Sequence, residues 1–222
     1  MINVENLSEA IALKISSNLS TVHDKEVLAY GAFILIQTVL SIITIALFGI
    51  IFDVFIEALT ISFAASILRK FSGGAHATSA INCAFIGMIV FGTLAIFVKH
   101  LLIKVDIIYL VIITIISFLL VFYIMYKYSP VGTATKPLIN ENIRKRLKKK
   151  SIKFTLSLFI ANITLLFLYL HLKQNILLNF TICITVGAVW QSITLVSLGH
   201  KIIDLLDKVL GGTKKFIRRT NK

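Results

Sequence analysis

Acidic residues and cysteines are scarce in this chain of 222 residues. Its 10 acidic residues face 23 lysines and arginines, and the formal net charge is +13. The two cysteines, Cys83 and Cys183, cannot form a disulfide framework, and their expected positions at a membrane face and inside an apolar helix argue against a mutual bridge. Residues 1–28 contain no continuous apolar stretch, so we expect no cleavable signal peptide. The histidines lack metal-ligand spacing, and we expect neither a metal nor a cofactor.

Apolar residues, by contrast, are more abundant than a soluble domain of this size can bury. They make up 57% of the chain, and the mean hydropathy is +0.91. Six long apolar runs lie at about 29–52, 54–68, 84–98, 105–126, 152–171 and 176–198. Most of them approach the roughly 20 residues that a helix needs to cross the hydrocarbon core of a bilayer. The sequence therefore predicts an all-α, polytopic integral membrane protein with about six transmembrane helices in a single membrane domain (1–222).

The run 54–68 is the weakest of the six predicted spans. It is short, and Asp53 and Glu57 lie at its start. Ionisable groups inside a bilayer are costly, and incomplete spans are tolerated where protein covers them or where they line a cavity. We therefore expect this helix to be tilted, or to stop within the membrane and line a cavity.

Amphipathic helices are predicted on both sides of the transmembrane region 29–198. In residues 1–28, apolar side chains recur every three or four positions, as in a helix that rests on the inner leaflet or packs on the bundle. These side chains are Val4, Leu7, Ile11, Ile15 and Leu19. A second such pattern, within the basic cytoplasmic tail 199–222, predicts a short helix over His200–Leu210 that Gly211 and Gly212 would end. Its apolar members are Ile202, Ile203, Leu205, Leu206 and Val209, and its polar members are Lys201, Asp204, Asp207 and Lys208.

Basic residues indicate how the helices are oriented, because short loops rich in lysine and arginine stay in the cytoplasm. With six spans and both ends inside, 20 of the 23 basic residues are cytoplasmic, and only Lys99, Lys104 and Lys173 are outside. This orientation places the segment 69–83 and the loop 127–151 on the cytoplasmic side of the cell membrane. Thiols remain reduced in that compartment.

The loop 127–151 ends in a dense basic run. Its members are Arg144, Lys145, Arg146, Lys148, Lys149 and Lys150. The rule for loop charge explains the net charge without a partner, but this run is also dense enough to hold anionic membrane lipids or an acidic peptide tail. Nucleic acid is a poor partner, because the run lacks interleaved aromatic residues and sits between two spans.

The segment 69–83 is a polar, glycine-bearing break in the apolar sequence, and it contains a base and a nucleophile. His76 and Cys83 lie seven residues apart. An imidazole can remove the proton of a thiol, and the resulting thiolate attacks a peptide carbonyl. On one continuous helix the two residues would stand about 10.5 Å apart along the axis, whereas proton transfer needs about 3 Å. The backbone must therefore bend between them, and a helix starting near Ser79 would place Cys83 near the positive end of its dipole.

The neighbours of this pair allow two interpretations each. Backbone N–H groups around Gly73 and Gly74 could form an oxyanion hole, or the two glycines could provide only a flexible turn. Arg69 could orient a substrate carboxylate or stabilise developing charge, or it could be only the basic flank of the second span. Asn82 and Ser72 are polar candidates for orienting His76, although adjacency in sequence is poor evidence of geometry.

These residues resemble the signature of the accessory gene regulator protein B (AgrB) family, membrane peptidases of Gram-positive quorum sensing. That signature has an arginine, a Gly-Gly-x-His and a cysteine seven residues after the histidine, and all of its positions match here. The matching residues are Arg69, Gly73, Gly74, His76 and Cys83. The resemblance is specific over 69–83 and extends, less specifically, to chain length, number of spans and the basic loop with its prolines.

The resemblance implies a cysteine endopeptidase whose base is His76 and whose nucleophile is Cys83. Its implied substrate is an AgrD-type propeptide with an amphipathic leader, a central cysteine and an acidic C-terminal tail. Cleavage would release the tail and leave a thioester on Cys83, which the cysteine of the peptide displaces to close a thiolactone ring. The site would need to exclude water, and we expect it to be recessed among the apolar helices. Whether the protein forms a homodimer is left open.

Two other classes of protein compete with this interpretation. A transporter or channel could use polar residues in or near the spans, with Glu57 as the foremost candidate. The other such residues are Asp53, Asn162 and Gln191. A non-catalytic membrane partner would need only its apolar faces, and in that case Cys83 would react with thiol probes no differently from Cys183.

Overall fold

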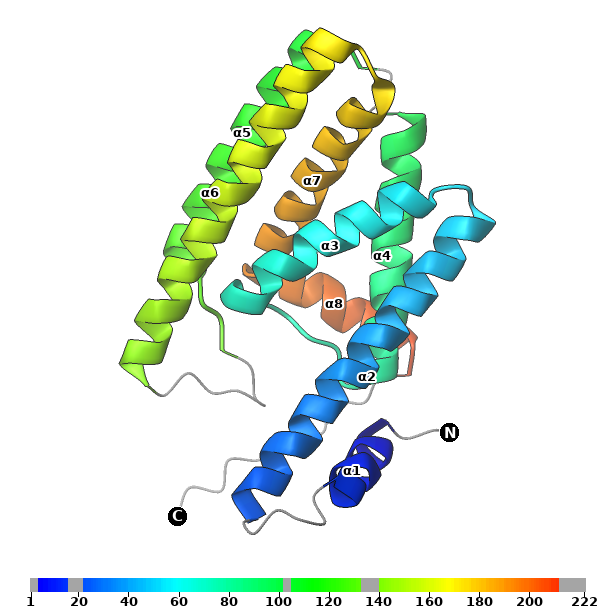
Figure 1. The fold of residues 1–222 in the computed structure, drawn as a ribbon, viewed down its shortest axis with the longest axis vertical. Coiled ribbons are helices and arrows are strands. Elements are labelled where there is room, and N and C mark those ends of the chain that lie inside the picture. The colour runs from blue at the N-terminus through cyan, green and yellow to red at the C-terminus, as the bar shows by residue number, and fades with distance from the viewer. Residues whose placement is uncertain (1–3, 16–21, 102–104, 133–139, 212–222) are drawn as a thin grey trace.

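The computed structural model describes residues 4–15, 22–101, 105–132 and 140–211. The helices in this part of the chain are α1 (Val4–Ile15), α2 (Val22–Ile51), α3 (Phe55–Ser72), α4 (Ala80–His100), α5 (Ile107–Tyr128), α6 (Glu141–Leu172), α7 (Asn175–Ile193) and α8 (Ser197–Val209). Within it, the β-type pairing amounts to one isolated bridge between Gly73 and Val131. The predicted all-α fold class is confirmed (Figure 1).

Five helices among the described residues are long and apolar enough to cross a membrane. They are Val27–Ile51 within α2, and α4, α5, α6 and α7. Large apolar side chains on these helices face outward, as contact with lipid requires; Leu35 and Leu119, for example, are 68% and 64% exposed. The chain is therefore a polytopic membrane protein, and the predicted number of about six spans is close to the observed five.

The difference of one is α3, which coincides with the weakest predicted span. It contains Glu57, Arg69 and Lys70 within 18 residues. A helix of that length rises about 27 Å, slightly less than the roughly 30 Å of the hydrocarbon core. Figure 1 shows α3 lying obliquely across the bundle, where it contacts α2, α4, α6 and α7. Glu57 is thus buried against protein and Arg69 is half-buried, whereas Lys70, in the last turn, is exposed.

The packing of α3 on α7 accommodates the acidic residue that the sequence placed in this span. A Cβ atom on Gly187 would lie 2.5 Å from the carbonyl oxygen of Ile61, so the two helices approach closely because Gly187 has no side chain. Nearby, the buried carboxylate of Glu57 accepts a hydrogen bond of 2.8 Å from Nδ2 of Asn179. A local partner therefore accounts for Glu57 without an ion pathway.

The N-terminal helix α1 packs on α2. Val4, Ser8 and Ala12 are buried, whereas Leu7 and Leu13 are exposed. This arrangement favours packing on the bundle over a helix that only rests on lipid; Leu19 of the predicted stripe lies outside the described residues. Helix α2 itself starts at Val22, before the predicted apolar run at 29–52, because polar residues continue the helix beyond its apolar part.

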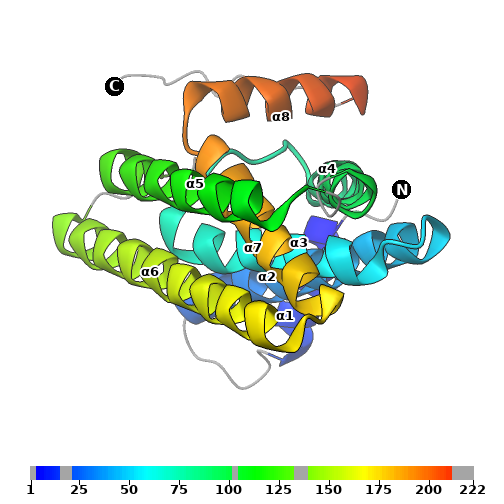
Figure 2. The same ribbon diagram turned by 90° about the horizontal axis from the view of Figure 1, so that it is seen from above.

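Helix α8 confirms the short helix predicted over His200–Leu210, although it begins earlier, at Ser197. Figures 1 and 2 show it running across one face of the bundle, from the end of α7 to the start of α4. One part of the prediction is wrong. Asp207, assigned to the polar face of this helix, is only 3% exposed. It is buried because α8 lies on the loop between α3 and α4, which supplies hydrogen-bond donors.

Candidate active site

The segment 69–83 joins α3 to α4 and contains the predicted bend. Helix α3 ends at Ser72, and α4 begins at Ala80, with Ser79 as its N-cap. The Ser79 hydroxyl accepts a hydrogen bond from the backbone N–H of Asn82 at 3.1 Å, as N-cap residues do. His76 therefore lies in the loop, whereas Cys83 lies in the first turn of α4, near the positive end of the helix dipole.

The two glycines make the sharp turn at the end of α3. Their φ angles are +71° at Gly73 and +135° at Gly74, a region that favours glycine. A Cβ atom on Gly73 would lie 2.1 Å from the carbonyl oxygen of Val131, and one on Gly74 would lie 2.6 Å from Oγ1 of Thr194. The turn is thus packed between the residues that follow α5 and the end of α7, and it is not merely flexible.

The N–H groups of the two glycines differ in their hydrogen bonding. The N–H of Gly73 donates to the carbonyl oxygen of Arg69 at 2.9 Å. The N–H of Gly74 makes no hydrogen bond within the described ranges. Gly74 is therefore the better candidate for an oxyanion donor.

Arg69 connects the parts of this segment. Its Nη2 donates a hydrogen bond to the carbonyl oxygen of Ala75, next to His76. Its guanidinium also interacts electrostatically with the imidazole of His76 and with the thiolate form of Cys83. The structure thus brings Arg69 within electrostatic range of both candidate catalytic residues, which sequence spacing alone does not establish.

The environment of His76 keeps its imidazole neutral. Although the residue retains an exposed face, the protein atoms packed around the ring disfavour its charged form, and the positive charge of Arg69 adds to this effect. Together they lower the pKa of His76 from 6.5 to about 4. An uncharged imidazole at neutral pH is the form that can accept a proton from a thiol.

Cys83 and Cys183 differ sharply in their surroundings. Both thiols are free, but Cys83 is half-buried whereas Cys183 is only 1% exposed, with its Sγ atom 3.6 Å from Oδ1 of Asn179. Across the part of the chain that the structure describes, no hydrogen bond joins His76 to Cys83. Catalytic hydrogen bonds are often long before substrate binds, and proton transfer between these two residues stays a prediction.

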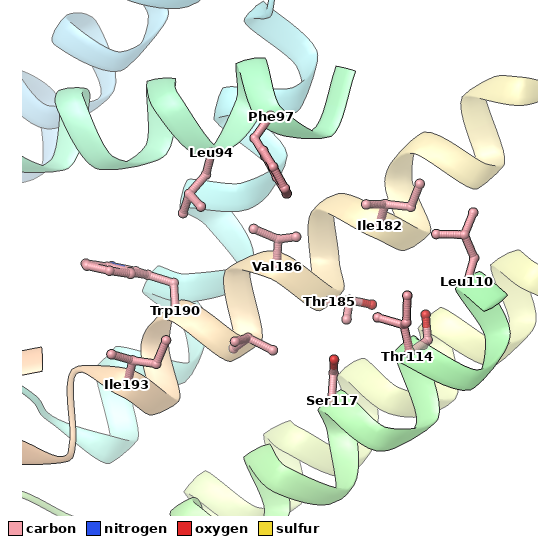
Figure 3. A pocket seen from close by; sticks show the side chains of 12 residues that line it. Leu94, Phe97, Leu110, Thr114, Ser117, Ile182, Thr185, Val186, Trp190 and Ile193 are labelled. Carbon is pink, nitrogen blue, oxygen red and sulfur yellow. The ribbon is translucent and has the colours of Figure 1, made fainter. Parts of the chain in front are cut away.

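The apolar cavity of the bundle lies apart from this segment. It has a volume of about 240 Å³ and lies between α4, α5 and α7. Figure 3 shows Leu94 and Phe97 of α4 and Trp190 of α7 around it, and no residue of 69–83 lines it. Because His76 is exposed and Cys83 is half-buried, the candidate site is a surface loop, not the recess that the sequence led us to expect.

The loop arrangement and its residues can be compared with known proteins. The sequence model of the family Accessory gene regulator B matches residues 8–195. The chain belongs to this family. An AgrB-like protein of Clostridium perfringens strain SM101 is 38% identical over 207 residues, which cover 92% of this chain and 96% of the relative. An AgrB-like protein of Listeria innocua is 28% identical over 174 residues, 78% of each chain. No solved structure matches the chain.

As a member of the AgrB family, the chain has a role in quorum sensing.

The basic run of the chain reaches the candidate site at one end, through Lys150. The predicted loop 127–151 is partly helical: α6 starts at Glu141 and carries the run on its first turns, while residues 133–139 lie outside the described ranges. Nζ of Lys150 lies 5.8 Å from the ring centroid of Phe71, two residues before Gly73. The ring of Phe71 also stacks on Phe154 of α6, with centroids 4.5 Å apart.

The polar residues that bind the segment 69–83 were not predicted to contact it. Asn82, a candidate for orienting His76, instead donates to Asp207 on α8 at 2.7 Å. Ser72, the other candidate, accepts from Nε2 of Gln191 on α7 at 2.9 Å. Polar residues in apolar α7 and on amphipathic α8 were the available signal, but their pairing with a loop more than 100 residues away is visible only in the fold.

Proposed function

We propose that the protein is a cysteine endopeptidase that removes the C-terminal tail of an AgrD-type propeptide and promotes closure of a thiolactone ring. The observation that carries the proposal is the position of Arg69, which donates a hydrogen bond to the carbonyl oxygen of Ala75, next to His76, and whose charge acts on both His76 and Cys83. A cation beside both groups disfavours a positive imidazole and stabilises negative charge that develops on sulfur. We propose that this chemistry takes place on the cytoplasmic side, because the distribution of basic residues among the loops predicts that the segment 69–83 lies there.

The first half of the reaction exchanges a peptide bond for a thioester. His76 takes the proton of the Cys83 thiol, and the sulfur attacks the carbonyl carbon at the junction with the tail. The carbon–nitrogen bond then breaks, and the imidazolium returns its proton to the leaving amine. This half yields the free tail and a peptide joined to Sγ of Cys83, with the N–H of Gly74 as the candidate donor to the oxyanion.

The second half exchanges one thioester for another. The cysteine within the peptide attacks the acyl carbon as its thiolate, the bond to Sγ of Cys83 breaks, and the Cys83 sulfur takes up a proton. This exchange is nearly even in free energy, whereas the first half is uphill. Ring closure therefore competes with hydrolysis of the acyl-enzyme. Because His76 is exposed, we propose that the bound peptide and the adjoining membrane surface, not a closed cavity, exclude water from it.

The proposed reaction is tested by its products. The purified protein is reconstituted in liposomes with a small AgrD-type propeptide, and the peptides are identified by mass spectrometry. We expect the free tail and a tail-free thiolactone, with the thiolactone as the main peptide product. A tail-free linear acid as the main product would contradict the exclusion of water, and no cleavage at all would contradict the peptidase itself. Glu57→Gln should leave cleavage intact, because Glu57 pairs with Asn179 and not with the loop.

The basic run on α6 is suited to hold the acidic tail during the first half of the reaction. Its last residue, Lys150, lies against Phe71, two residues before Gly73, so we propose that the tail of a peptide held at Gly73 and Gly74 runs toward it. Attraction between exposed charges is screened by salt, with a range that falls from about 30 Å at 0.01 M to about 3 Å at 1 M ionic strength.

We therefore expect the KM for the propeptide to rise several-fold over this range of salt, with a smaller change in kcat. The matched control is a propeptide whose tail carries amides in place of carboxylates. Its KM should already be high at low salt and should change little. Equal salt dependence of the two propeptides would assign the basic run to anionic lipids instead.

A further inference from the structure

Helix α8 is hydrogen-bonded to the segment around His76 through a single carboxylate, that of Asp207. Asp207 is 3% exposed and accepts three hydrogen bonds. The backbone N–H of Thr78 donates to its Oδ2 at 3.1 Å, the hydroxyl of Thr78 donates to Oδ1 at 3.2 Å, and Nδ2 of Asn82 donates to Oδ1 at 2.7 Å. Asp207 thus holds the residue two positions after His76 and the residue directly before Cys83.

The other end of the loop is held as well. The backbone N–H of Ala75 donates to the carbonyl oxygen of Thr194, at the end of α7, at 3.1 Å. The carbonyl oxygen of Ala75 accepts from Arg69. His76 therefore lies between two residues that are held in place, Ala75 and Thr78. Ala75 is bonded to the end of α7, and Thr78 is bonded to α8.

Apolar packing of α8 places the carboxylate of Asp207 against Thr78 and Asn82. Ile203, one turn before Asp207, is buried in a cluster with Ala75, Ile86 and Val90. Leu206 and Ala77 pack against the same cluster. The inner face of α8 therefore presents one acceptor group among apolar side chains. Burial of a carboxylate is favourable only when donors satisfy it, and the three donors from Thr78 and Asn82 do so.

We propose that Asp207 is a positioning residue for the proposed cysteine peptidase reaction. It acts through Thr78 and Asn82 to fix the position of His76 relative to Cys83. The inference rests on the proposed function. Asp207 makes no hydrogen bond to His76 or Cys83 in the described part of the chain, so it acts on their placement and not on their chemistry. Without it, three donors lose their acceptor and the loop between α3 and α4 loses its link to α8.

The test compares Asp207→Ala and Asp207→Asn with the wild-type protein in liposomes that contain the propeptide. A misplacement of about 1 Å costs about 100-fold in rate, so we expect Asp207→Ala to lower kcat by about that factor and to change KM less than about threefold. Asn82→Ala should lower kcat less, because the Thr78 bonds remain, and should cost little more in the Asp207→Ala background. The control is Asp106→Asn, an exposed aspartate with no side-chain hydrogen bond to α5, at the other end of the bundle.

A positioning role also predicts a rescue that a merely structural role does not. Asn82→Asp alone sets two carboxylates against each other and should lower kcat strongly. Combined with Asp207→Asn it restores one hydrogen bond between the two positions with donor and acceptor exchanged, and part of the lost kcat should return. The rate of alkylation of Cys83 by iodoacetamide should follow kcat in all these variants, while buried Cys183 stays unreactive and reports an intact fold.

The outcomes separate the inference from the proposed function. Full kcat in Asp207→Asn, or a double variant no better than Asn82→Asp, would overturn the positioning role. If Asp207→Ala exposes Cys183 to alkylation, the judgement rests on Asp207→Asn and on the exchange, which keep the volume of the side chain. Failure of the wild-type protein to cleave, or cleavage by Cys83→Ala, would instead overturn the proposed function.

Discussion

Replacement of Cys83 by alanine is expected to abolish release of the tail. The proposed reaction passes through a bond between Sγ of Cys83 and the acyl carbon, and alanine offers no nucleophile in its place. Cys83→Ser should also be inactive or nearly so, because a serine hydroxyl is a far weaker acid than a thiol and the lowered pKa of His76 makes its imidazole a weaker base. The measurement is the time course of tail release in liposomes, monitored by mass spectrometry.

His76→Ala should lower the rate of tail release but not abolish it. Loss of a general base typically costs between about 100-fold and 10,000-fold in rate, and the sulfur of Cys83 remains as the nucleophile. Cys183→Ala and His171→Ala are the controls, since Cys183 is buried away from the loop and His171 is exposed near the opposite end of α6. Activity that survives Cys83→Ala, or that is lost in Cys183→Ala, would contradict the assignment.

Gly73→Ala is expected to have the second largest effect. The residue has a φ of +71° and a ψ of −149°, a combination essentially limited to glycine, and an alanine there costs on the order of 1–3 kcal/mol for conformation alone. The added methyl group would also lie 2.1 Å from the carbonyl oxygen of Val131, so the turn has to move. His76 follows three residues later, and we expect kcat to fall by about 100-fold or more because the loop is displaced.

Gly211 provides a matched control for this variant. It has a φ of +78°, like Gly73, but no atom of the described residues lies within 4 Å of a Cβ built on it. Gly211→Ala therefore also places an alanine at a positive φ but without the collision, and its kcat should be close to that of the wild type. Equal losses in the two variants, or a fully active Gly73→Ala, would show that the contact with Val131 does not place the loop.

Much of the architecture follows from the sequence because lipid imposes simple rules. Apolar runs of the required length became α2, α4, α5, α6 and α7, and the short run with Glu57 became the oblique helix α3. A helix buried against protein can contain charges that a lipid-facing helix cannot, and single-sequence patterns do not distinguish the two. Hence the number of apolar segments was predictable, but the path of α3 through the bundle was not.

The candidate site was predictable in its local part only. The bend between His76 and Cys83 follows from the distance that proton transfer allows, and the helix considered to start near Ser79 does begin there, at Ala80. The contacts that shape the loop come from far along the chain, from Val131, Thr194 and Asp207. Asp207 looked like one more charge on a polar helix face, because nothing in the sequence indicates that a loop with three donors covers that face.

The acyl-enzyme on Cys83 is the central claim, and trapping it tests that claim most directly. A propeptide whose internal cysteine is replaced by alanine cannot close the ring, so the thioester should accumulate on the protein. Intact-mass measurement should then show the wild-type chain heavier by the tail-free peptide minus one water, an adduct that hydroxylamine removes and that peptide mapping assigns to Cys83. Tail release with an unmodified chain, or an adduct that maps to Cys183, would contradict the account.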